Sequence, residues 1–303
     1  MLVRFLIEEF IAEKRYENVT EASIKTSEYN YKHLESFLIS EGIEQIKDIN
    51  SRVAKRYMMK CKENGDKPTT LNSRLKRIKA LFNWAVKEQV IEQNPFSDVK
   101  KVREDVRINT FTDEEVKEIL SYLRRKKRRE DSFYAVRNYT VFLTLIGSGI
   151  RIGELSNLRW EDFNFDTGQM KVFGKARREA NVPLASRLLR ELALWKTYCE
   201  NKFNKTSPYV FVSQANEPLT SNAVKCFFKR LSQAMDFPET RCSAHSCRHY
   251  YAKTYIQSGG DIVSLARILR HTSIKTTERY LHFFGNELAE QNEKFNPLNN
   301  LNI

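Results

Sequence analysis

Two short stretches near the end of the chain gather side chains that could bind an anion. The first is SAHSCRHYYA (243–252) and the second is HTSIKTTERY (271–280). In the first stretch His245, Arg248 and His249 have i, i+3, i+4 spacing, so on a helix they share one face. Cations and donors crowded in this way repel one another unless an anion lies between them. Taken alone, the commoner interpretation is buried histidines bonded to the backbone and an arginine in a salt bridge.

A metal site is another interpretation of this stretch, because Cys242, His245, Cys247 and His249 are close in sequence. Their spacing matches no common zinc pattern, the sequence has no HExxH motif, and Arg248 would repel a cation. The five cysteines are scattered, odd in number and without a CxxC pair, which favours reduced thiols in a cytosol over a disulfide framework. We therefore expect no metal and no other cofactor.

Two weaker signals lie upstream. Arg151 and Glu154 are one helical turn apart after the glycine break in GSGIRIGEL, which by itself predicts a local ion pair. Lys175 follows Gly174 at the end of a predicted strand in VFGKARRE, where a flexible ammonium could swing toward a ligand. Most lysines in such places are simply solvated, so neither signal identifies a site alone.

Composition indicates the class of partner. The chain of 303 residues has a formal net charge of +13 and a sequence pI of about 9.4. This excess favours a polyanionic partner, nucleic acid above all, over the alternative that the charge serves only solubility. A hydrophobic fraction of 41% is enough to bury real cores. The opening MLVRFLIEEFIAEKRY predicts an amphipathic helix, since it carries charges and no cleavage site. No apolar run approaches the roughly 20 residues of a membrane span, so we expect a cytoplasmic protein with no membrane partner.

The elements that must position these residues fall into two blocks. Residues 1–98 are predicted to form a helical domain, because apolar positions recur at helical spacing and glycines follow two of the runs. The run TTLNSRLKRIKALFNWAVKEQVI has one apolar face and one basic face. A solvated face is the default interpretation of the basic side, and phosphate contact is the other. The expected DNA contacts are Arg74, Lys76, Arg77 and Lys79, together with Arg177 of the second block.

A polar, charged stretch at 99–110 is the predicted linker between the blocks. A second domain is expected over 111–290, with a polar tail at 291–303. This domain opens with TDEE, a capping box at 112–115. The basic run Arg124–Arg129 is expected to be an exposed loop that at most contacts a DNA backbone.

Within the second block the apolar period changes. YTVFLTLIGSGIRIGELSNLRW (139–160) predicts a helix, a break and a second helix. Three short strands follow, DFNF, MKVFG and EANVPL, with a turn at Asp166-Thr167-Gly168. Mostly helical sequence then continues to about residue 290. The predicted fold class is mainly α with a small antiparallel β-sheet (α+β).

The order and spacing of the motifs carry more weight than each motif alone. SGIRIGELSNLRW, VFGKARREANVPL, HSCRHYYA and LRHTSIKTTERY together resemble the tyrosine recombinases, the phage integrase family. The resemblance is specific over 140–285. Over 1–98, where family members carry a helical core-binding domain that clamps DNA, it is compatible through helical content only. The family's functional positions fall on Arg151, Lys175, His245, Arg248, His271 and Tyr280.

The resemblance implies cleavage and rejoining of duplex DNA without metal or ATP. Arg151 and Arg248 would clamp the non-bridging phosphate oxygens through charge-assisted hydrogen bonds. Tyr280 would attack the phosphorus and form a covalent 3′-phosphotyrosine, which conserves the bond energy for rejoining.

The other family positions would move protons and orient the phosphate. Lys175 would protonate the leaving 5′ oxygen, and His245 would accept or return the tyrosine proton. His271 would hold another phosphate oxygen, and Glu154 would support the site.

Three positions depart from the family pattern. The family usually has Gly before the last histidine, where this chain has Arg270, which either crowds His271 or adds a phosphate contact. It usually has Leu before the second arginine, where this chain has Cys247. Its hairpin normally reads GKGxK, where this chain continues with Ala176 and Arg177. Neither Cys247 nor Ala176 removes a catalytic group.

Two functions are compatible with this pattern. The first is a site-specific recombinase of the integrase or excisionase type that acts on phage or other mobile DNA. The alternative is a DNA-binding regulator or repressor that keeps the recombinase fold without strand exchange. A complete catalytic set favours the first, because a pure binder has no need for Tyr280. The expected partners are double-stranded DNA, further copies of the chain in a dimer or tetramer on DNA, and accessory directionality or host factors.

Overall fold

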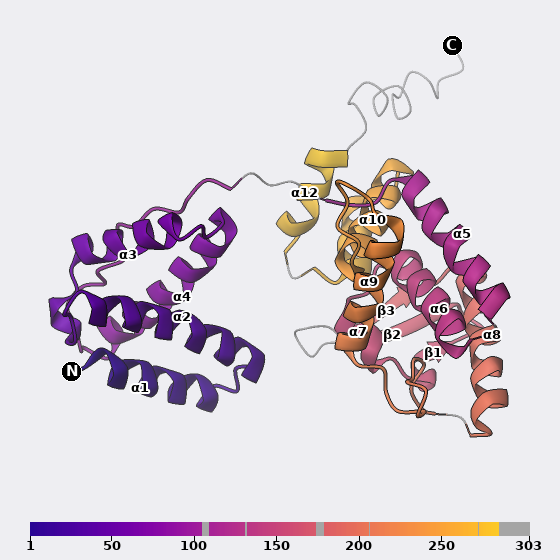
Figure 1. Cartoon of the computed structure of the whole chain (residues 1–303), viewed down its shortest axis with the longest axis horizontal. Coiled ribbons are helices and arrows are strands. Elements are labelled where there is room, and N and C mark those ends of the chain that lie inside the picture. Colours follow the sequence, from indigo (N-terminus) through magenta and orange to yellow (C-terminus); the bar gives the residue numbers. More distant parts are fainter. Residues whose placement is uncertain (105–108, 131, 174–178, 206, 272, 285–303) are drawn as a thin grey trace, which may run out of the picture. The chain divides into compact units, whose positions relative to one another are not determined.

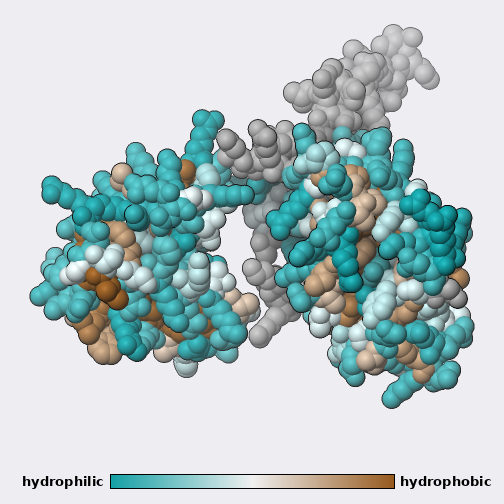
Figure 2. All heavy atoms as spheres, viewed as in Figure 1, coloured by the Kyte–Doolittle hydropathy of each residue, from teal (hydrophilic) through white to brown (hydrophobic). Residues whose placement is uncertain are grey.

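The computed structural model describes residues 1–104, 109–130, 132–173, 179–205, 207–271 and 273–284, without the side chains of 281–284. The chain divides into two units, Met1–Val106 and Arg107–Ile303 (Figure 1). The face drawn in Figure 2 is largely hydrophilic with separate apolar areas, in keeping with a mean hydropathy of −0.56. Among the described residues, no helix combines the length and apolar character that crossing a membrane requires.

The first unit is helical, as its apolar spacing predicts. Its elements are α1 (Val3–Tyr16), α2 (Glu21–Ser40), the short 3₁₀ helix η1 (Ile46–Asp48), α3 (Ser51–Glu63) and α4 (Pro68–Lys87). Asn50 caps α3 by accepting hydrogen bonds from the backbone amides of Arg52 and Val53 at 3.0 and 3.1 Å. Pro68 lies in the first turn of α4, where its missing N–H breaks no helical hydrogen bond. Local signals of this kind fix where the helices α3 and α4 begin.

Helix α4 buries the predicted apolar stripe, and Arg74 lies on that stripe as well. Its side chain is 3% exposed, forms an ion pair with Asp66 at 3.0 Å and donates a hydrogen bond to Tyr57 Oη at 3.4 Å. Position 74 is three residues after Leu71 and four before Ile78, so helical spacing turns it inward. The expectation that Arg74 lies on the exposed basic face is therefore wrong.

The segment after α4 packs back on the first unit. Val99 belongs to the hydrophobic core of this unit. The Asn72 side chain donates to the carbonyl of Val102 at 2.8 Å and accepts from its amide at 2.9 Å. The first residues of the expected linker 99–110 therefore belong structurally with the first unit.

The second unit opens with the predicted capping box. Glu115 Oε2 accepts from the amide of Thr112 at 2.8 Å, and Thr112 Oγ1 accepts from the amide of Glu115 at 3.1 Å. The helix that follows, α5 (Asp113–Glu130), contains the basic run Arg124–Arg129, so the expectation of a loop there is wrong. The acidic first turn and basic last turn of α5 both complement the helix dipole, which is why the charge run favours helix.

The three predicted strands are confirmed as an antiparallel sheet with the order β1-β2-β3. They are β1 (Phe163–Asn164), β2 (Gln169–Phe173) and β3 (Glu179–Pro183). Met170 of β2 pairs with Phe163 on one side and Val182 on the other, and all three side chains are buried. The turn between β1 and β2 contains Gly168 at a φ of +66°, as the Asp-Thr-Gly signal predicts.

A helix broken at one glycine runs through the core of the second unit. The helices besides α5 are α6 (Phe133–Ser148), α7 (Ile152–Asn157), the 3₁₀ helix η2 (Trp160–Asp162), α8 (Ser186–Phe203), α9 (Ser221–Met235), α10 (Ala244–Gln257), α11 (Ile262–Leu269) and α12 (Lys275–Phe284). Helix α6 packs against α5, α8 and α10 and ends at Gly149, whose φ is +62°. A Cβ at Gly149 would lie 2.9 Å from both Leu269 and Tyr251, so glycine fits this position and larger residues do not. The break confirms the predicted helix–break–helix and places Arg151 at the start of α7.

Candidate active site

Helix α10 carries the first cluster on its first two turns, as predicted. Ser243 caps the helix by accepting a hydrogen bond from the amide of Ser246 at 3.1 Å. His245 is exposed, His249 is half-buried, and Arg248 is only 3% exposed. The shared face of these three side chains therefore reaches from solvent into the core.

Arg248 is fixed by backbone carbonyls from two other elements. Its Nη1 donates to the carbonyl of Gly149 at 2.7 Å, and its Nη2 donates to the carbonyl of Leu269. These described partners are carbonyls, not the carboxylate of an ordinary salt bridge. Burial, together with the charges of Arg151 and Arg270, lowers the pKa of Arg248 to about 10. The guanidinium is still cationic at neutral pH, and its position is set before any ligand binds.

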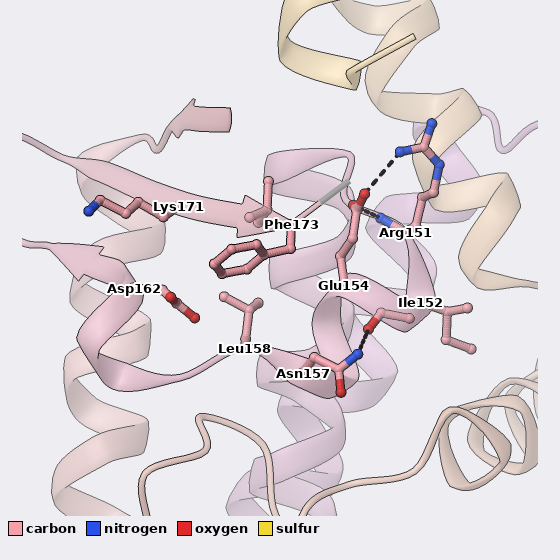
Figure 3. Close-up of a pocket in the computed structure, with 10 residues that line it drawn as sticks. Arg151, Ile152, Glu154, Asn157, Leu158, Asp162, Lys171 and Phe173 are labelled. Carbon is pink, nitrogen blue, oxygen red and sulfur yellow. Dashed lines mark hydrogen bonds and ion pairs between the residues drawn. The ribbon is translucent and has the colours of Figure 1, made fainter. Parts of the chain in front are cut away.

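Arg151 and Glu154 form the ion pair that their spacing predicts (Figure 3). Oε1 of Glu154 lies 2.9 Å from Nη1 of Arg151, and Oε2 accepts from the backbone amide of Arg151 at 2.7 Å. Burial works to raise the pKa of Glu154, but these hydrogen bonds and the charge of Arg270 outweigh it and hold the pKa below its usual value. The Arg151 side chain stays 36% exposed, so it is within reach of a ligand.

Arg270 faces a partner that the sequence did not predict for it, the carboxylate of Glu154. It caps α11 at a φ of +53°, in the left-handed region that suits the family's usual glycine. Its side chain is 6% exposed, and its Nη2 lies 2.5 Å from Oε2 of Glu154. Its Nη1 donates to the carbonyl of Ile268 at 2.7 Å, while its own carbonyl accepts from Arg151 at 3.4 Å. Glu154 therefore bridges two arginines, and the Arg270 guanidinium faces that carboxylate.

Replacing Arg270 with the usual glycine is expected to destabilise the second unit. Breaking a buried ion pair costs about 3–5 kcal/mol, whereas glycine in the left-handed region recovers about 1 kcal/mol. Because Glu154 keeps Arg151 as a partner, we expect Arg270→Gly to lower the free energy of unfolding by about 2 kcal/mol, measured by denaturant titration. Arg270→Asn is the matched control, since Asn also tolerates this φ but lacks the charge. A glycine variant more stable than wild type would contradict a structural role for the pair.

Tyr280 lies on α12 with only 4% of its surface exposed. Its hydroxyl is hydrogen-bonded to Nδ1 of His249 at 2.7 Å. Its ring is nearly parallel to that of His271, with 6.5 Å between centroids and 5° between planes. Two histidines from different segments therefore position the tyrosine.

His271 is held by a buried threonine. Its Nδ1 lies 2.7 Å from Oγ1 of Thr277, whose side chain is fully buried. Burial, followed by the charges of Arg248 and Arg151, lowers the pKa of His271 to about 4. Burial and neighbouring arginines also lower the pKa of His245. Both imidazoles are therefore neutral at neutral pH and available for hydrogen bonding to a phosphate.

Two residues of this cluster were given no site role from the sequence. His249 shares a helix face with His245, and that signal was visible, but nothing in the sequence indicated which histidine meets the tyrosine. Thr277 lies six residues after His271 in the TTERY run. Its role as the partner of His271 follows from the turn into α12, which brings the two together.

The remaining expected contacts lie elsewhere or outside the described residues. Lys175 and Arg177 fall in the segment 174–178, which is outside them. Lys76 on α4 is exposed, whereas Arg77 and Lys79 are partly buried and donate hydrogen bonds within the first unit. Of the four α4 residues expected to contact DNA, Lys76 is thus the exposed one.

The two cysteines near the cluster are buried thiols. Burial raises the pKa of Cys242 to about 12 and that of Cys247 well above its usual value. Both thiols are therefore protonated at neutral pH. Within the described part of the chain, no three His, Cys, Asp or Glu side chains are grouped as a metal site.

A cavity of about 380 Å³ adjoins the cluster on the side of α7 and β2 (Figure 3). Its wall includes Arg151, Glu154, Asp162, Lys171 and Phe173. Arg151 links this cavity to the cluster, whereas the residues of α10 and α12 do not line it. The chemistry described above therefore lies beside the cavity, not inside it.

Known families and proteins match most of this chain. The phage integrase family matches residues 109–287, and the phage integrase SAM-like domain matches residues 4–103. Tyrosine recombinase XerC of Halalkalibacterium halodurans is 26% identical over 296 residues, covering 94% of each chain. Tyrosine recombinase XerA of Pyrococcus furiosus is 26% identical over 267 residues, covering 88% of each.

Solved structures share the fold. The Tn1549 transposon integrase in complex with transposon right end DNA superposes with a TM-score of 0.78 at 20% identity, covering 97% of this chain and 99% of that one. A lambda integrase dimer bound to a COC′ core site gives a TM-score of 0.73 at 18% identity, covering 91% and 97%. The family match spans more than half of the 303 residues and contains Arg151, Arg248 and Tyr280. The chain therefore belongs to the phage integrase family of tyrosine-type site-specific recombinases, enzymes that cleave and rejoin DNA.

Proposed function

We propose that this chain cleaves and rejoins duplex DNA at a specific site through a covalent 3′-phosphotyrosine at Tyr280, without metal or ATP. The observation that supports this most is the position of Tyr280, whose hydroxyl is bonded to His249 and whose ring lies parallel to His271. The charges of Arg248 and Arg151 act on the same hydroxyl. A nucleophile beside two arginines suits attack on a phosphodiester, which is an anion that gains charge in the transition state.

The two arginines would share the clamping of the phosphate. Arg248, fixed by two carbonyls, would offer donors that need no rearrangement. Arg151 is more exposed and would close on the phosphate, while its ion pair with Glu154 keeps the guanidinium oriented. His271, neutral and held by Thr277, would donate to another phosphate oxygen.

Two protons must move when the strand is cleaved. The hydroxyl proton of Tyr280 would pass to the histidine pair of α10, His245 and His249. Lys175 would protonate the leaving 5′ oxygen. Reversal of both transfers would rejoin the strand, and the phosphotyrosine conserves the energy of the broken phosphodiester.

The assembly proposed for this chain follows that of its relatives. Lambda integrase has been crystallised as a dimer bound to a COC′ core site and as a tetramer bound to a Holliday junction. We extend this to dimers and tetramers of the present chain on double-stranded DNA, in the cytoplasm, with accessory directionality or host factors as further partners. Domains 1–98 and 111–290, joined by 99–110, would both contact the duplex. The tail 291–303 lies outside the described residues.

Wild-type protein is expected to form a covalent adduct with DNA in the presence of a chelator, because no metal takes part in the proposed chemistry. The substrate would be a duplex selected by binding from a random pool, with a nick that lets the cleaved fragment diffuse away. The adduct would be measured as a DNA–protein band that survives denaturation in SDS. Tight binding without an adduct at any nick position would support the DNA-binding regulator instead. An adduct that appears only with added magnesium would overturn the metal-free mechanism.

A further inference from the structure

The described hydrogen bond to the hydroxyl of Tyr280 comes from a histidine that the family resemblance leaves without a role. Nδ1 of His249 lies 2.7 Å from Tyr280 Oη, a short distance for a hydroxyl and a ring nitrogen. The pair joins α10 to α12 across 31 positions of the chain. A group already in contact with the nucleophilic oxygen is within reach of its proton, which is the first requirement for a general base.

The protonation states fix the direction of this hydrogen bond. Burial lowers the pKa of His249 to about 4, with further lowering from His245 and Arg248 on α10, Arg279 on α12 and His271 before α12. The ring is therefore neutral at neutral pH.

The hydroxyl of Tyr280, by contrast, carries a proton. Burial raises the pKa of Tyr280, while the charges of Arg248, Arg279 and Arg151 work against that rise. The hydroxyl therefore keeps its proton and donates it to Nδ1 of His249. The neutral ring then carries its own hydrogen on Nε2.

His245 occupies a different place in the same pair. Its ring packs edge-to-face on that of His249, with 4.1 Å between centroids. Its side chain is exposed, whereas that of His249 is half-buried against Tyr280. The exposed imidazole of His245 is placed to hydrogen-bond a phosphate oxygen. The inner imidazole of His249 is placed to bond the hydroxyl of Tyr280.

We propose that His249 is a catalytic residue that accepts the Tyr280 proton during attack on DNA. This rests on the proposed function. As Tyr280 Oη bonds to phosphorus, its proton moves to Nδ1 of His249, which becomes an imidazolium. The bond from phosphorus to the 5′ oxygen breaks, and that oxygen takes a proton from the general acid, the role given to Lys175. In the rejoining step the imidazolium returns its proton to the departing phenol oxygen.

The same charges make the basicity of His249 depend on whether DNA is bound. In the free protein, burial and, after it, the surrounding cations keep His249 a weak base. A phosphate anion between Arg151, Arg248 and His249 offsets those cations and favours the imidazolium. His249 therefore becomes an effective proton acceptor when the scissile phosphate is in place, which protects the nucleophile from activation without DNA.

The test compares His249→Asn and His249→Ala with wild type in single-turnover adduct formation on nicked DNA, at saturating protein, as a function of pH. Asn places an amide oxygen near the position of Nδ1 and so keeps an acceptor without a base. A general base contributes about 10²–10⁴-fold, so both variants should be slowed by at least about 100-fold at neutral pH. The rate of each should then rise about tenfold per pH unit, because attack needs prior ionisation of the phenol, while wild type stays flat between about pH 7 and 9.

The first unit offers a matched control pair. Nδ1 of His33 lies 3.0 Å from Oη of Tyr57, the same atoms in a different setting. His33→Asn should leave the adduct rate and its pH profile unchanged. His245→Asn should slow the reaction while retaining the flat wild-type profile. Circular dichroism and DNA binding of every variant would confirm that each is folded.

The outcomes separate this inference from the proposed function. A wild-type adduct together with a His249→Asn rate and pH profile equal to wild type would overturn the role of His249. A steep pH profile in His245→Asn, with a flat one in His249→Asn, would assign the base to His245. Absence of a wild-type adduct would defeat the proposed function itself.

Discussion

Tyr280→Phe is expected to bind DNA with wild-type affinity and to form no covalent adduct. The substitution removes one oxygen, and the parallel packing of the ring on His271 is retained. Attack on phosphorus needs the oxygen, so the loss should be complete at every pH, unlike the loss in His249 variants. The measurement is the SDS-resistant adduct on nicked DNA, read beside an electrophoretic mobility shift of the same sample.

Stability provides the control for this prediction. Removing the hydroxyl leaves Nδ1 of His249 without a described partner, which costs about 1–3 kcal/mol for a buried group. Tyr57→Phe removes the corresponding hydroxyl from the His33 pair and also a hydrogen-bond partner of buried Arg74, so it should cost at least as much and leave the adduct intact. An adduct from Tyr280→Phe would show that another residue is the nucleophile, and peptide mapping of the adduct would locate it.

Arg248→Lys is expected to lower the rate of adduct formation by about 10²–10³-fold, the usual effect of losing one preorganised donor to a developing anion. Lysine keeps the charge but has no planar fork, so it cannot hold both the Gly149 and Leu269 carbonyls and still face a phosphate. The rate would be measured at saturating DNA to separate chemistry from binding. Arg248→Ala should be slower still and also less stable, because it leaves both carbonyls unpaired.

Arg137 is the matched control for Arg248. It is also buried, at 4% exposure, and its pKa is also lowered by burial. It donates to the carbonyl of Val212 at 3.4 Å and has no contact with the cluster among its described hydrogen bonds. Arg137→Lys should therefore cost stability without a comparable loss of rate. Equal losses of rate in the two variants would mean that Arg248 acts through folding alone.

The sequence predicted local structure well because its signals are local. The capping box at Thr112 and Glu115 involves residues three apart, and the turn at Gly168 involves adjacent ones. Apolar residues alternate in the strands and recur at helical spacing in the helices, so the element types follow from the neighbouring residues. The prediction of a loop at Arg124–Arg129 was wrong because the charge run was interpreted without regard to its position at the end of a helix.

The sequence alone determined the family and the helical and strand elements, and it predicted the six catalytic positions as a set of motifs. Tertiary structure decided what these side chains touch. The contact of Arg270 with Glu154 spans 116 positions, and that of His249 with Tyr280 spans 31. No local period encodes such pairs, because they depend on how α7, α10, α11 and α12 pack around the break at Gly149. Packing therefore turned Arg270 toward Glu154 and brought His249, ahead of His245, to the hydroxyl of Tyr280.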